Sequence, residues 1–411
     1  MRKGVKLMLC IIAACGLLCS CHKGEPKETV SLKLWGPERN QELLREMSDE
    51  FCENYKDQAE IDIHIGVEDE NDFKGDYLKN VEGSADVFSF VDDQLYELVS
   101  HKSLLPITFG TDKVISESGG EDSPAVQSAM CGGQLYACPK TASNGYFLYY
   151  NSEYFSEKDI KSFDQILKVA EKAGKKVYMD WSSGWYIYSF FGGAGFELKL
   201  NSDRVTNWCN WNKKSGKYAG TDVAEAMLRI SSSEAFFSGN NDEFREGVEK
   251  GEIIAGVSGT WNVDIVSKTY GNHYAAAKLP TYTILGDQVQ MASFSGYKLM
   301  GVNATTKHPE WAQKLAIWLT NEQNQKRFYE GTGEGPANIK AAQSQSVQKS
   351  PALKALLDQR QYSIVQNVGG NFWDASTAFG MIMVSGNKDN LALQDVLDDL
   401  VEETEAPLKE N

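Results

Sequence analysis

Hydrophobic positions in the first third of the chain switch repeatedly between the spacing of strands and the spacing of helices. Residues 30–35 form a short apolar run, and residues 41–55 then carry apolar side chains at helical spacing. Further strands are expected at 61–65 and 86–90, and further helices at 72–81 and 92–100. Strands that alternate with helices predict a mainly parallel sheet covered by helices.

The middle of the chain repeats this alternation. Its expected strands are 147–150, 176–179 and 253–257, and its expected helices are 163–173, 185–191, 222–231 and 261–269. Helical spacing returns at 308–329, after Pro351 and at 390–403. We therefore predict two α/β units. Ligands of such units bind beyond the carboxyl ends of the strands, which directs attention to residues 35–38 and 90–94.

The N-terminus has the pattern of an export signal. Arg2, Lys3 and Lys6 precede an almost unbroken apolar run at 7–18. This run is too short to span a bilayer comfortably. We expect the rest of the chain to be exported; an uncleaved membrane anchor is the alternative.

The end of the apolar run, from Leu18 to Cys21, resembles a bacterial lipoprotein signal, in which the last cysteine becomes lipidated. Cys15 offers a competing match but lies inside the apolar run. We expect residues 1–20 to be the lipoprotein signal peptide, Cys21 to carry the lipid, and residues 21–29 to form a polar tether. The mature protein is then anchored on the extracellular face of the membrane.

Charge excludes one class of partner. The chain has 411 residues, 57 acidic and 41 basic side chains, and a formal net charge of -16. Loss of residues 1–20 removes three basic and no acidic residues, which leaves 38 minus 57, or -19. Nucleic acid and anionic lipid both require clustered Lys and Arg. We therefore expect no nucleic-acid partner, and membrane contact only through the N-terminal lipid.

Motifs for cofactors and catalysis are missing from the sequence. No Gly-Lys pair is followed by Ser or Thr, as a P-loop requires, and the glycine clusters at 192–195 and 331–335 lack the third glycine of a dinucleotide fingerprint. The five histidines are dispersed without metal-ligand spacing. We expect no cofactor, no metal and no catalytic residue.

The cysteines beyond the export signal show no CxxC pair. They are Cys52, Cys131, Cys138 and Cys209. An expected hairpin turned at Gly132 and Gly133 would place Cys131 opposite Gln134 and not opposite Cys138. We expect free, partly buried thiols.

Aromatic and acidic side chains gather at the expected strand-to-helix junctions. The junction rings are Trp35, Trp181, Trp185, Trp261 and Trp373, and the acids within three residues of such rings are Glu38, Asp93, Asp180 and Asp374. Sugars stack on aromatic rings and donate hydroxyl hydrogen bonds to carboxylates, so this combination indicates carbohydrate binding. The alternative is that individual rings belong to the core, as we expect for Trp311 and Trp318 on one helix face.

Several stretches resemble the maltose-binding protein and its relatives among the bacterial periplasmic sugar-binding proteins. They are 31–36, 86–90, the hairpin 133–139 running into 147–151, Ser258 to Trp261, 301–304 and 321–323. Their order and spacing agree over about residues 30–405. The resemblance implies an α/β fold of the type II periplasmic-binding-protein (Venus-flytrap) class, with discontinuous lobes linked by a hinge that closes on the ligand.

By this resemblance, the N-terminal lobe comprises 30–141 and 297–340, and the C-terminal lobe comprises 142–296 and 341–411. The expected ligand-binding residues are Trp35, Glu38, Phe90, Asp93, Asn144, Trp185, Trp261 and Trp373. The sequence also departs from the family pattern. Gln94 and Thr377 stand where arginine is common, and Asn144 and Ser183 stand where glutamate is common, which casts doubt on maltose itself.

The function implied by the resemblance is that of a lipid-anchored, extracellular substrate-binding protein of an ABC transporter. It is expected to be a monomer that captures an oligosaccharide, with a maltodextrin favoured, and delivers it to membrane permease subunits. One alternative is a surface-anchored glycoside hydrolase that uses two of the junction acids. Another is a binding protein for a non-sugar solute such as a peptide or polyamine, which an acidic cleft would suit.

Overall fold

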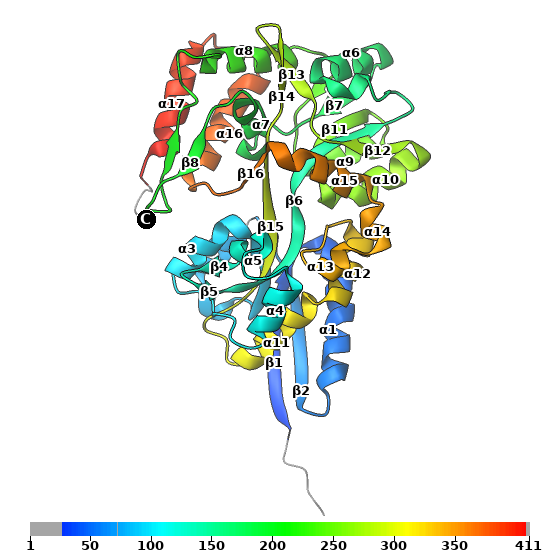
Figure 1. Cartoon of the computed structure of the whole chain (residues 1–411), viewed down its shortest axis with the longest axis vertical. Helices are drawn as coiled ribbons and strands as arrows, with labels where there is room; N and C mark the ends of the chain where they lie inside the picture. Colours follow the sequence, from blue (N-terminus) through cyan, green and yellow to red (C-terminus); the bar gives the residue numbers. More distant parts are fainter. Residues whose placement is uncertain (1–26, 72, 408–411) are drawn as a thin grey trace, which may run out of the picture.

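Two lobes are stacked along the long axis of the molecule, and two long strands run between them (Figure 1). The computed structural model describes residues 27–71 and 73–407. The expected signal peptide and Cys21 lie outside the described residues. No helix in the described part of the chain is long and apolar enough to cross a membrane.

The N-terminal lobe, in the lower half of Figure 1, packs around one hydrophobic core. Its elements are β1 (Glu28–Gly36), α1 (Gln41–Tyr55), β2 (Ala59–Val67), α2 (Phe73–Lys79), β3 (Val87–Val91), α3 (Leu95–Ser100), α4 (Thr111–Glu117), α5 (Pro124–Ser128), β4 (Met130–Cys131), β5 (Gln134–Leu135), α11 (Pro309–Leu319) and α12 (Glu322–Thr332). Strand β1 pairs in parallel with β2 and with β3, as the strand and helix alternation predicts. The hairpin of β4 and β5 places Cys131 opposite Gln134, also as expected.

The C-terminal lobe packs around two further cores. Its elements are α6 (Phe163–Ala173), β7 (Lys176–Tyr178), α7 (Gly184–Gly193), β8 (Leu198–Leu200), β9 (Asn207–Cys209), α8 (Gly220–Ser231), β10 (Phe236–Phe237), α9 (Asn241–Glu249), β11 (Ile253–Gly259), α10 (Val263–Tyr270), β12 (Tyr274–Ala277), β13 (Thr281–Ile284), β14 (Asp287–Gln290), α15 (Pro351–Gln359), α16 (Asn371–Val384) and α17 (Leu393–Glu405). Helices α13 (Ile339–Ala342) and α14 (Gln345–Gln348) connect α12 to α15. The exact lobe boundaries stay predictions.

One sheet runs through both lobes because two strands are shared between them. These are β6 (Ala137–Asn151) and β15 (Ser293–Val302), which pair antiparallel with each other. The strand order of the sheet is β10-β7-β11-β6-β15-β3-β1-β2. Their register shifts between Gly296 and Lys298, at the level where the lobes meet. The sheet is therefore mixed. The expected parallel pairing holds for β1 with β2 and β3 and for β7 with β10 and β11, whereas β6 pairs antiparallel with β11 and β12, and β15 with β3. The short β16 (Ser363–Val365) adds to the edge of β15 in parallel.

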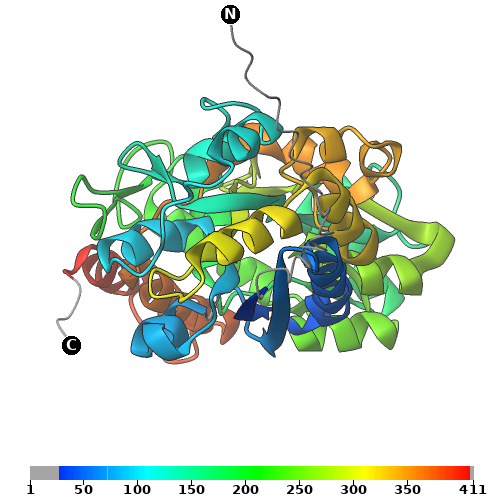
Figure 2. The same cartoon turned by 90° about the horizontal axis from the view of Figure 1, so that it is seen from below.

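The tryptophans of α11 belong to the core of the N-terminal lobe, as the sequence predicts. Trp311 is buried against Tyr55 of α1, and the Trp318 indole donates a hydrogen bond to the Met47 carbonyl at 2.9 Å. Figure 2 shows α1 (blue) and α11 (yellow) next to each other, seen from below. In the C-terminal lobe, Trp181 is fully buried, so this junction ring is also part of the core.

The four cysteines of the described residues are free thiols, which confirms the expectation from their spacing. Cys138 and Cys209 are buried, and burial raises the pKa of each thiol to about 12. Thiols with such pKa values stay protonated and unreactive at neutral pH. No disulfide therefore stabilises the described part of the chain.

Candidate functional site

A cavity of about 510 Å³ opens between the two lobes. This volume lies in the range of small-molecule binding sites. The residues that line it are Arg39, Asp69, Glu70, Asn71, Asp93, Gln94, Asn144, Tyr178, Asp180, Ser183, Trp185, Tyr186, Asn241, Trp261, Lys298, Gln366 and Trp373. Most of them follow the carboxyl ends of strands or begin helices, where ligands of α/β folds bind.

Three tryptophan rings line the cavity, and all three come from the C-terminal lobe. Trp185 begins α7 and stacks on Phe294 with ring centroids 5.4 Å apart, and Trp373 lies in the first turn of α16. Trp261 lies in the 3₁₀ helix Thr260–Asn262, with its ring folded back over Gly259. A Cβ on Gly259 would lie 2.0 Å from that ring, so only glycine permits this arrangement. The rings thus give the cavity apolar faces suited to stacking.

Polar groups from the N-terminal lobe and the shared strands face these rings. Asp93 and Gln94 follow β3, and Asn144 lies on β6 near its crossing with β15. Burial raises the pKa of Asp93 to about 6, although Lys74 and a 2.7 Å hydrogen bond from the Gln366 amide act against this rise. Five of the eight expected binding residues therefore line one cavity: Asp93, Asn144, Trp185, Trp261 and Trp373.

Three expected binding residues do not line the cavity. Phe90 is fully buried among Phe73, Phe88 and Gly301, so its ring has no face left for a ligand. The Trp35 ring packs directly over Gly66. A Cβ on Gly66 would lie 2.8 Å from the indole, which shows how close this contact is. Glu38 is exposed in the 3₁₀ helix after β1. The strand-end rule located the correct loops here but not the side chains that turn into the cleft.

Two further acids had been considered as catalytic partners. Asp180 lines the cavity on the side opposite Asp93, whereas Asp374 is exposed outside it. The residues that depart from the family pattern also fall into two groups, those that line the cavity and those that do not. Gln94 and Ser183 line the cavity, and the hydroxyl of Thr377 instead donates to the Ser182 carbonyl at 2.8 Å.

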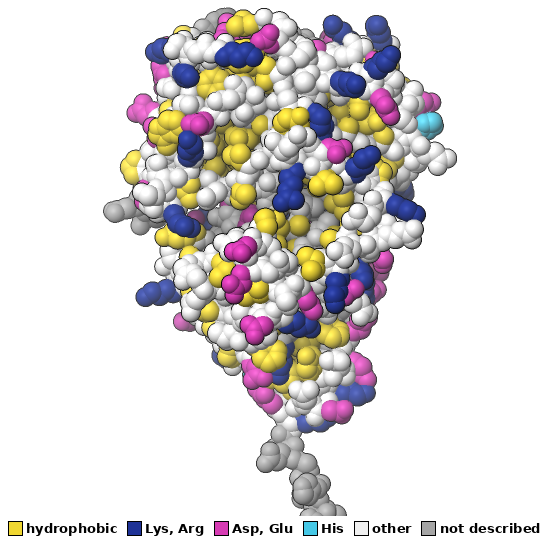
Figure 3. Space-filling model, viewed as in Figure 1, with side chains coloured by type: hydrophobic (Ala, Val, Ile, Leu, Met, Phe, Trp, Pro, Cys, Tyr) yellow, Lys and Arg dark blue, Asp and Glu magenta, His cyan; other side chains and the backbone are white. Residues whose placement is uncertain are grey.

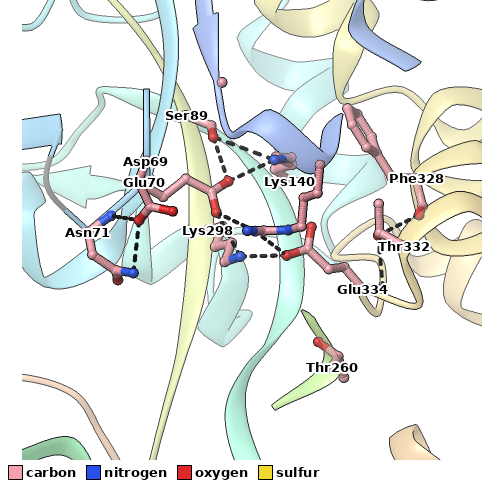
Figure 4. Close-up of polar contacts among 12 residues, drawn as sticks. Asp69, Glu70, Asn71, Ser89, Lys140, Thr260, Lys298, Phe328, Thr332 and Glu334 are labelled. Carbon is pink, nitrogen blue, oxygen red and sulfur yellow. Dashed lines mark hydrogen bonds and ion pairs between the residues drawn. The ribbon is translucent and has the colours of Figure 1, made fainter. Parts of the chain in front are cut away.

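A buried charge cluster (Figure 4) supplies part of the cavity floor on the side of the N-terminal lobe, where Arg39, Glu70 and Lys298 line the cavity. We use this name for Arg39, Glu70, Lys140, Lys298 and Glu334. The Glu70 carboxylate binds Lys140 at 2.9 Å, Lys298 at 2.7 Å and Arg39 at 3.0 Å, and it also accepts the hydroxyl of Ser89 at 2.6 Å. Glu334 pairs with Lys298 and with Arg39, the latter at 3.1 Å.

The cluster keeps its charges although four of its members are buried; Arg39 is 32% exposed. Glu70 and Lys140 are 2% and 1% exposed. Burial opposes ionisation of both carboxyl groups, but the surrounding cations hold the pKa of Glu70 well below its ordinary value and lower that of Glu334 to about 2. The cluster contains three cations and two ionised carboxylates, so the sum of its side-chain charges is +1.

The pattern of the sequence did not indicate this part of the cavity. Residues 68–72 are an acidic run in the sequence, which is typical of a solvated loop, yet Glu70 within them is buried and paired. The loop follows the carboxyl end of β2, and the strand-end rule was applied only to the loops after β1 and β3. Applying the same rule to β2 would have found Asp69, Glu70 and Asn71.

Comparison with known proteins gives the family. The model of a family described as bacterial extracellular solute-binding protein matches residues 47–355. The chain belongs to this family of solute-binding proteins. It is a family of binding proteins and not of enzymes, and this chain has the type II periplasmic-binding-protein fold.

Individual relatives agree with this assignment. The chain is 28% identical over 261 residues to the galactooligosaccharide-binding protein of Bacillus subtilis (strain 168), a match that spans 58% of each chain. It is 22% identical to the maltooligosaccharide ABC transporter solute-binding lipoprotein of Streptococcus pneumoniae serotype 4 (strain ATCC BAA-334 / TIGR4), over 69% of this chain and 70% of that one. A solved structure described as "with acarbose" superposes with a TM-score of 0.81 at 26% identity and covers 92% of this chain and 99% of that chain.

The surface of this solute-binding protein carries both signs of charge on the face seen in Figure 3. Figure 3 shows Lys and Arg side chains interspersed with acidic and neutral ones on the face that it presents. In the part of the chain that the structure describes, no three His, Cys, Asp or Glu side chains come together as metal ligands would.

Asp92, next to the cavity, makes the stability of this solute-binding protein depend on pH. Burial and the neighbouring Asp93 raise the pKa of Asp92 well above its ordinary value, although the Tyr297 amide donates to it at 3.0 Å. The protonated form is favoured in the folded state, so the stability from this group is complete below the unfolded pKa of about 4 and is lost as the pH rises through the folded pKa. We expect Asp92→Asn to gain stability relative to the wild type as the pH rises from about 4 to 8. Urea unfolding at several pH values measures this; a constant difference between the two proteins would contradict it.

Proposed function

We propose that this protein is the substrate-binding component of an ABC sugar transporter and that its cleft binds an oligosaccharide. The observation that carries the proposal is the arrangement of the cavity, in which Trp185, Trp261 and Trp373 face polar side chains of the other lobe. Aromatic faces stack on the apolar faces of sugar rings, and carboxylates and amides accept hydrogen bonds from hydroxyl groups. The relatives named for galactooligosaccharide and maltooligosaccharide binding support the same class of ligand.

Within this class we favour a maltodextrin-like glucan, with a galactooligosaccharide as the nearest alternative. The ligand is enclosed between an N-terminal lobe of 30–141 and 297–340 and a C-terminal lobe of 142–296 and 341–411, and the closed protein delivers it to membrane permease subunits. The protein acts as a monomer. The cysteine motif at Cys21 and the relative named as a lipoprotein support a lipid anchor on the extracellular face of the membrane.

Calorimetric titration of the mature, non-lipidated protein against malto-, galacto-, xylo- and cello-oligosaccharides tests the proposal. We expect saturable binding to one series, with the sugar recovered intact. Absence of binding to every series would contradict the proposal and shift the search to peptides and polyamines. Cleaved products would point to hydrolysis by Asp93 and Asp180, the two acids considered earlier that line the cavity.

Replacement of Trp261 with alanine should weaken oligosaccharide binding by about 1–3 kcal/mol, roughly 5- to 150-fold in Kd, because one stacking face is lost. Trp208→Ala is the matched control, because Trp208 is a C-terminal-lobe tryptophan that is 41% exposed and lies outside the cavity. Calorimetry measures both affinities, and circular dichroism checks the fold. Equal affinities of the two variants would exclude Trp261 from the binding site.

A further inference from the structure

The wall of the cavity in the C-terminal lobe presents polar groups that have no partner. Tyr178 ends β7, and Asp180 follows it two residues later. Tyr178 is 2% exposed, its ring stacks on Phe244, and its hydroxyl forms no hydrogen bond with any described residue. On β6, Asn144 is 8% exposed, lines the same cavity and likewise has no side-chain partner in the described chain. Both residues line the cavity, so a bound ligand can supply the hydrogen-bond partners that the described chain does not.

The Asp180 carboxylate has only half of its hydrogen-bonding capacity in use. Its Oδ1 accepts hydrogen bonds from the Ser182 amide at 2.8 Å and from the Ser182 hydroxyl at 2.6 Å. These bonds hold the carboxylate in the loop after the carboxyl end of β7. Burial raises the pKa of Asp180, the bonds from Ser182 oppose this, and the negative charge of Glu243 adds to the rise. No Lys or Arg among the described residues forms an ion pair with Asp180. Its second oxygen therefore lines the cavity as an uncompensated acceptor.

The charges around the cavity leave an excess of negative charge on its walls. The two cations that line it, Arg39 and Lys298, are both held by carboxylates of the buried charge cluster. That cluster carries +1, and Asp69 next to Arg39 brings the floor to zero. Asp93 and Asp180, one on each lobe, form no ion pair in the described residues; Lys74, which does not line the cavity, acts electrostatically on Asp93, and no Lys or Arg does so on Asp180. A neutral sugar would displace water from the cavity and leave the charge of Asp180 without a compensating cation, which is costly.

We propose that the preferred ligand is an oligosaccharide that carries a protonated amino group, and that this ammonium binds at Asp180 beside Tyr178. This inference rests on the proposed function, because it specifies the class of sugar. An ammonium offers three donors and no acceptor. It matches a carboxylate oxygen and a phenol oxygen that lack partners, and it supplies the missing positive charge. A sugar hydroxyl group supplies one hydrogen-bond donor and no charge, so it can bind only one of these two oxygens and leaves the charge of Asp180 uncompensated.

The experiment compares matched pairs of sugars by calorimetry at about pH 7, where a primary alkyl amine is protonated. Each pair consists of a malto- or galacto-oligosaccharide and the same sugar with one primary hydroxyl replaced by an amine, at one position at a time. We expect at least one amino sugar to bind the wild type about tenfold or more tightly than its neutral parent. Neutral parents that bind as tightly as every amino derivative would overturn the inference and leave the proposed function intact. Absence of binding by any sugar would overturn both.

Three variants test whether Asp180 and Tyr178 cause the preference for the amino sugar. Asp180→Asn keeps an oxygen for Ser182 and removes the charge, and Tyr178→Phe keeps the ring stacked on Phe244 and removes the hydroxyl. Both should reduce the ratio of amino-sugar to neutral-sugar affinity, with Asp180→Asn reducing it to near one. Asp374→Asn removes an equal charge from the same lobe outside the cavity and should leave the ratio unchanged. An equal loss for both sugars in Asp180→Asn would overturn the inference.

Discussion

Replacing Glu70 with glutamine is expected to lower the free energy of unfolding by about 3–5 kcal/mol. The carboxylate is 2% exposed and is the partner shared by all three cations of the buried charge cluster. Glutamine has nearly the same size but no charge, so Lys140 would stay buried without a counter-ion. The cluster would change from +1 to +2 around the buried Lys140, which is 1% exposed, and this makes the substitution the costliest change we predict.

Two further variants test whether the charge is the cause. Adding Lys140→Met to Glu70→Gln restores the cluster to +1 and should recover much of the lost stability, because an uncharged pair of similar volume is tolerated in a core. Glu97→Gln removes the partner of Lys74 in a 2.6 Å pair that is 31% and 40% exposed, and it should cost less than about 1 kcal/mol. Urea unfolding followed by circular dichroism measures all three. A loss of less than 1 kcal/mol for Glu70→Gln would show that the cluster does not hold the lobe together.

Replacing Gly380 with alanine is expected to cost about 2–3 kcal/mol or more, because the new methyl group has no space. Gly380 lies in α16, and a Cβ built there would lie 1.7 Å from the carbonyl oxygen of Trp181. A backbone oxygen cannot rotate away as a side chain can, so the helix itself must move. Because α16 also carries Trp373, the same substitution should weaken ligand binding.

Gly75 provides the matched control for this substitution. It lies in α2 of the other lobe, where a Cβ would meet nothing within 4 Å. Alanine is the better helix former by up to about 1 kcal/mol, so Gly75→Ala should be neutral or stabilising. Thermal unfolding of both variants, together with a sugar titration, measures the difference. Equal melting temperatures would mean that α16 is not seated on the Trp181 carbonyl as described.

The elements with a single apolar stripe could be predicted from the sequence. Helix α6 has the expected bounds, 163–173, and α1 and β1 begin within two residues of their expected starts. Helix α16 was not predicted as an element, because its apolar residues, among them Phe372, Trp373, Phe379 and Met383, contact neighbours on several sides and leave no clear periodicity. The pairing of β6 with β15 joins segments about 150 residues apart, and no local pattern specifies such a partner.

The candidate site was predictable to a similar extent. Rings at strand-to-helix junctions indicated Trp185, Trp261 and Trp373, because a junction residue is displaced from the periodic core. Phe90 was misassigned because every residue of β3 is buried, so alternation could not tell which face it occupies. The buried charge cluster could not be seen at all. Its members lie as far apart as positions 39 and 334, and only the finished sheet brings them together.

The place of β15 in the sheet also determines the order in which the protein can be completed during synthesis. Strand β15 lies between β3 and β6 and ends at Val302, so the sheet of the N-terminal lobe stays open until 302 of the 411 residues have been made. Until then the inner edges of β3 and β6 expose unpaired backbone groups, which are prone to pairing with other chains. The first lobe to be translated is therefore among the last parts to be finished, and a chain interrupted before Ser293 cannot form it.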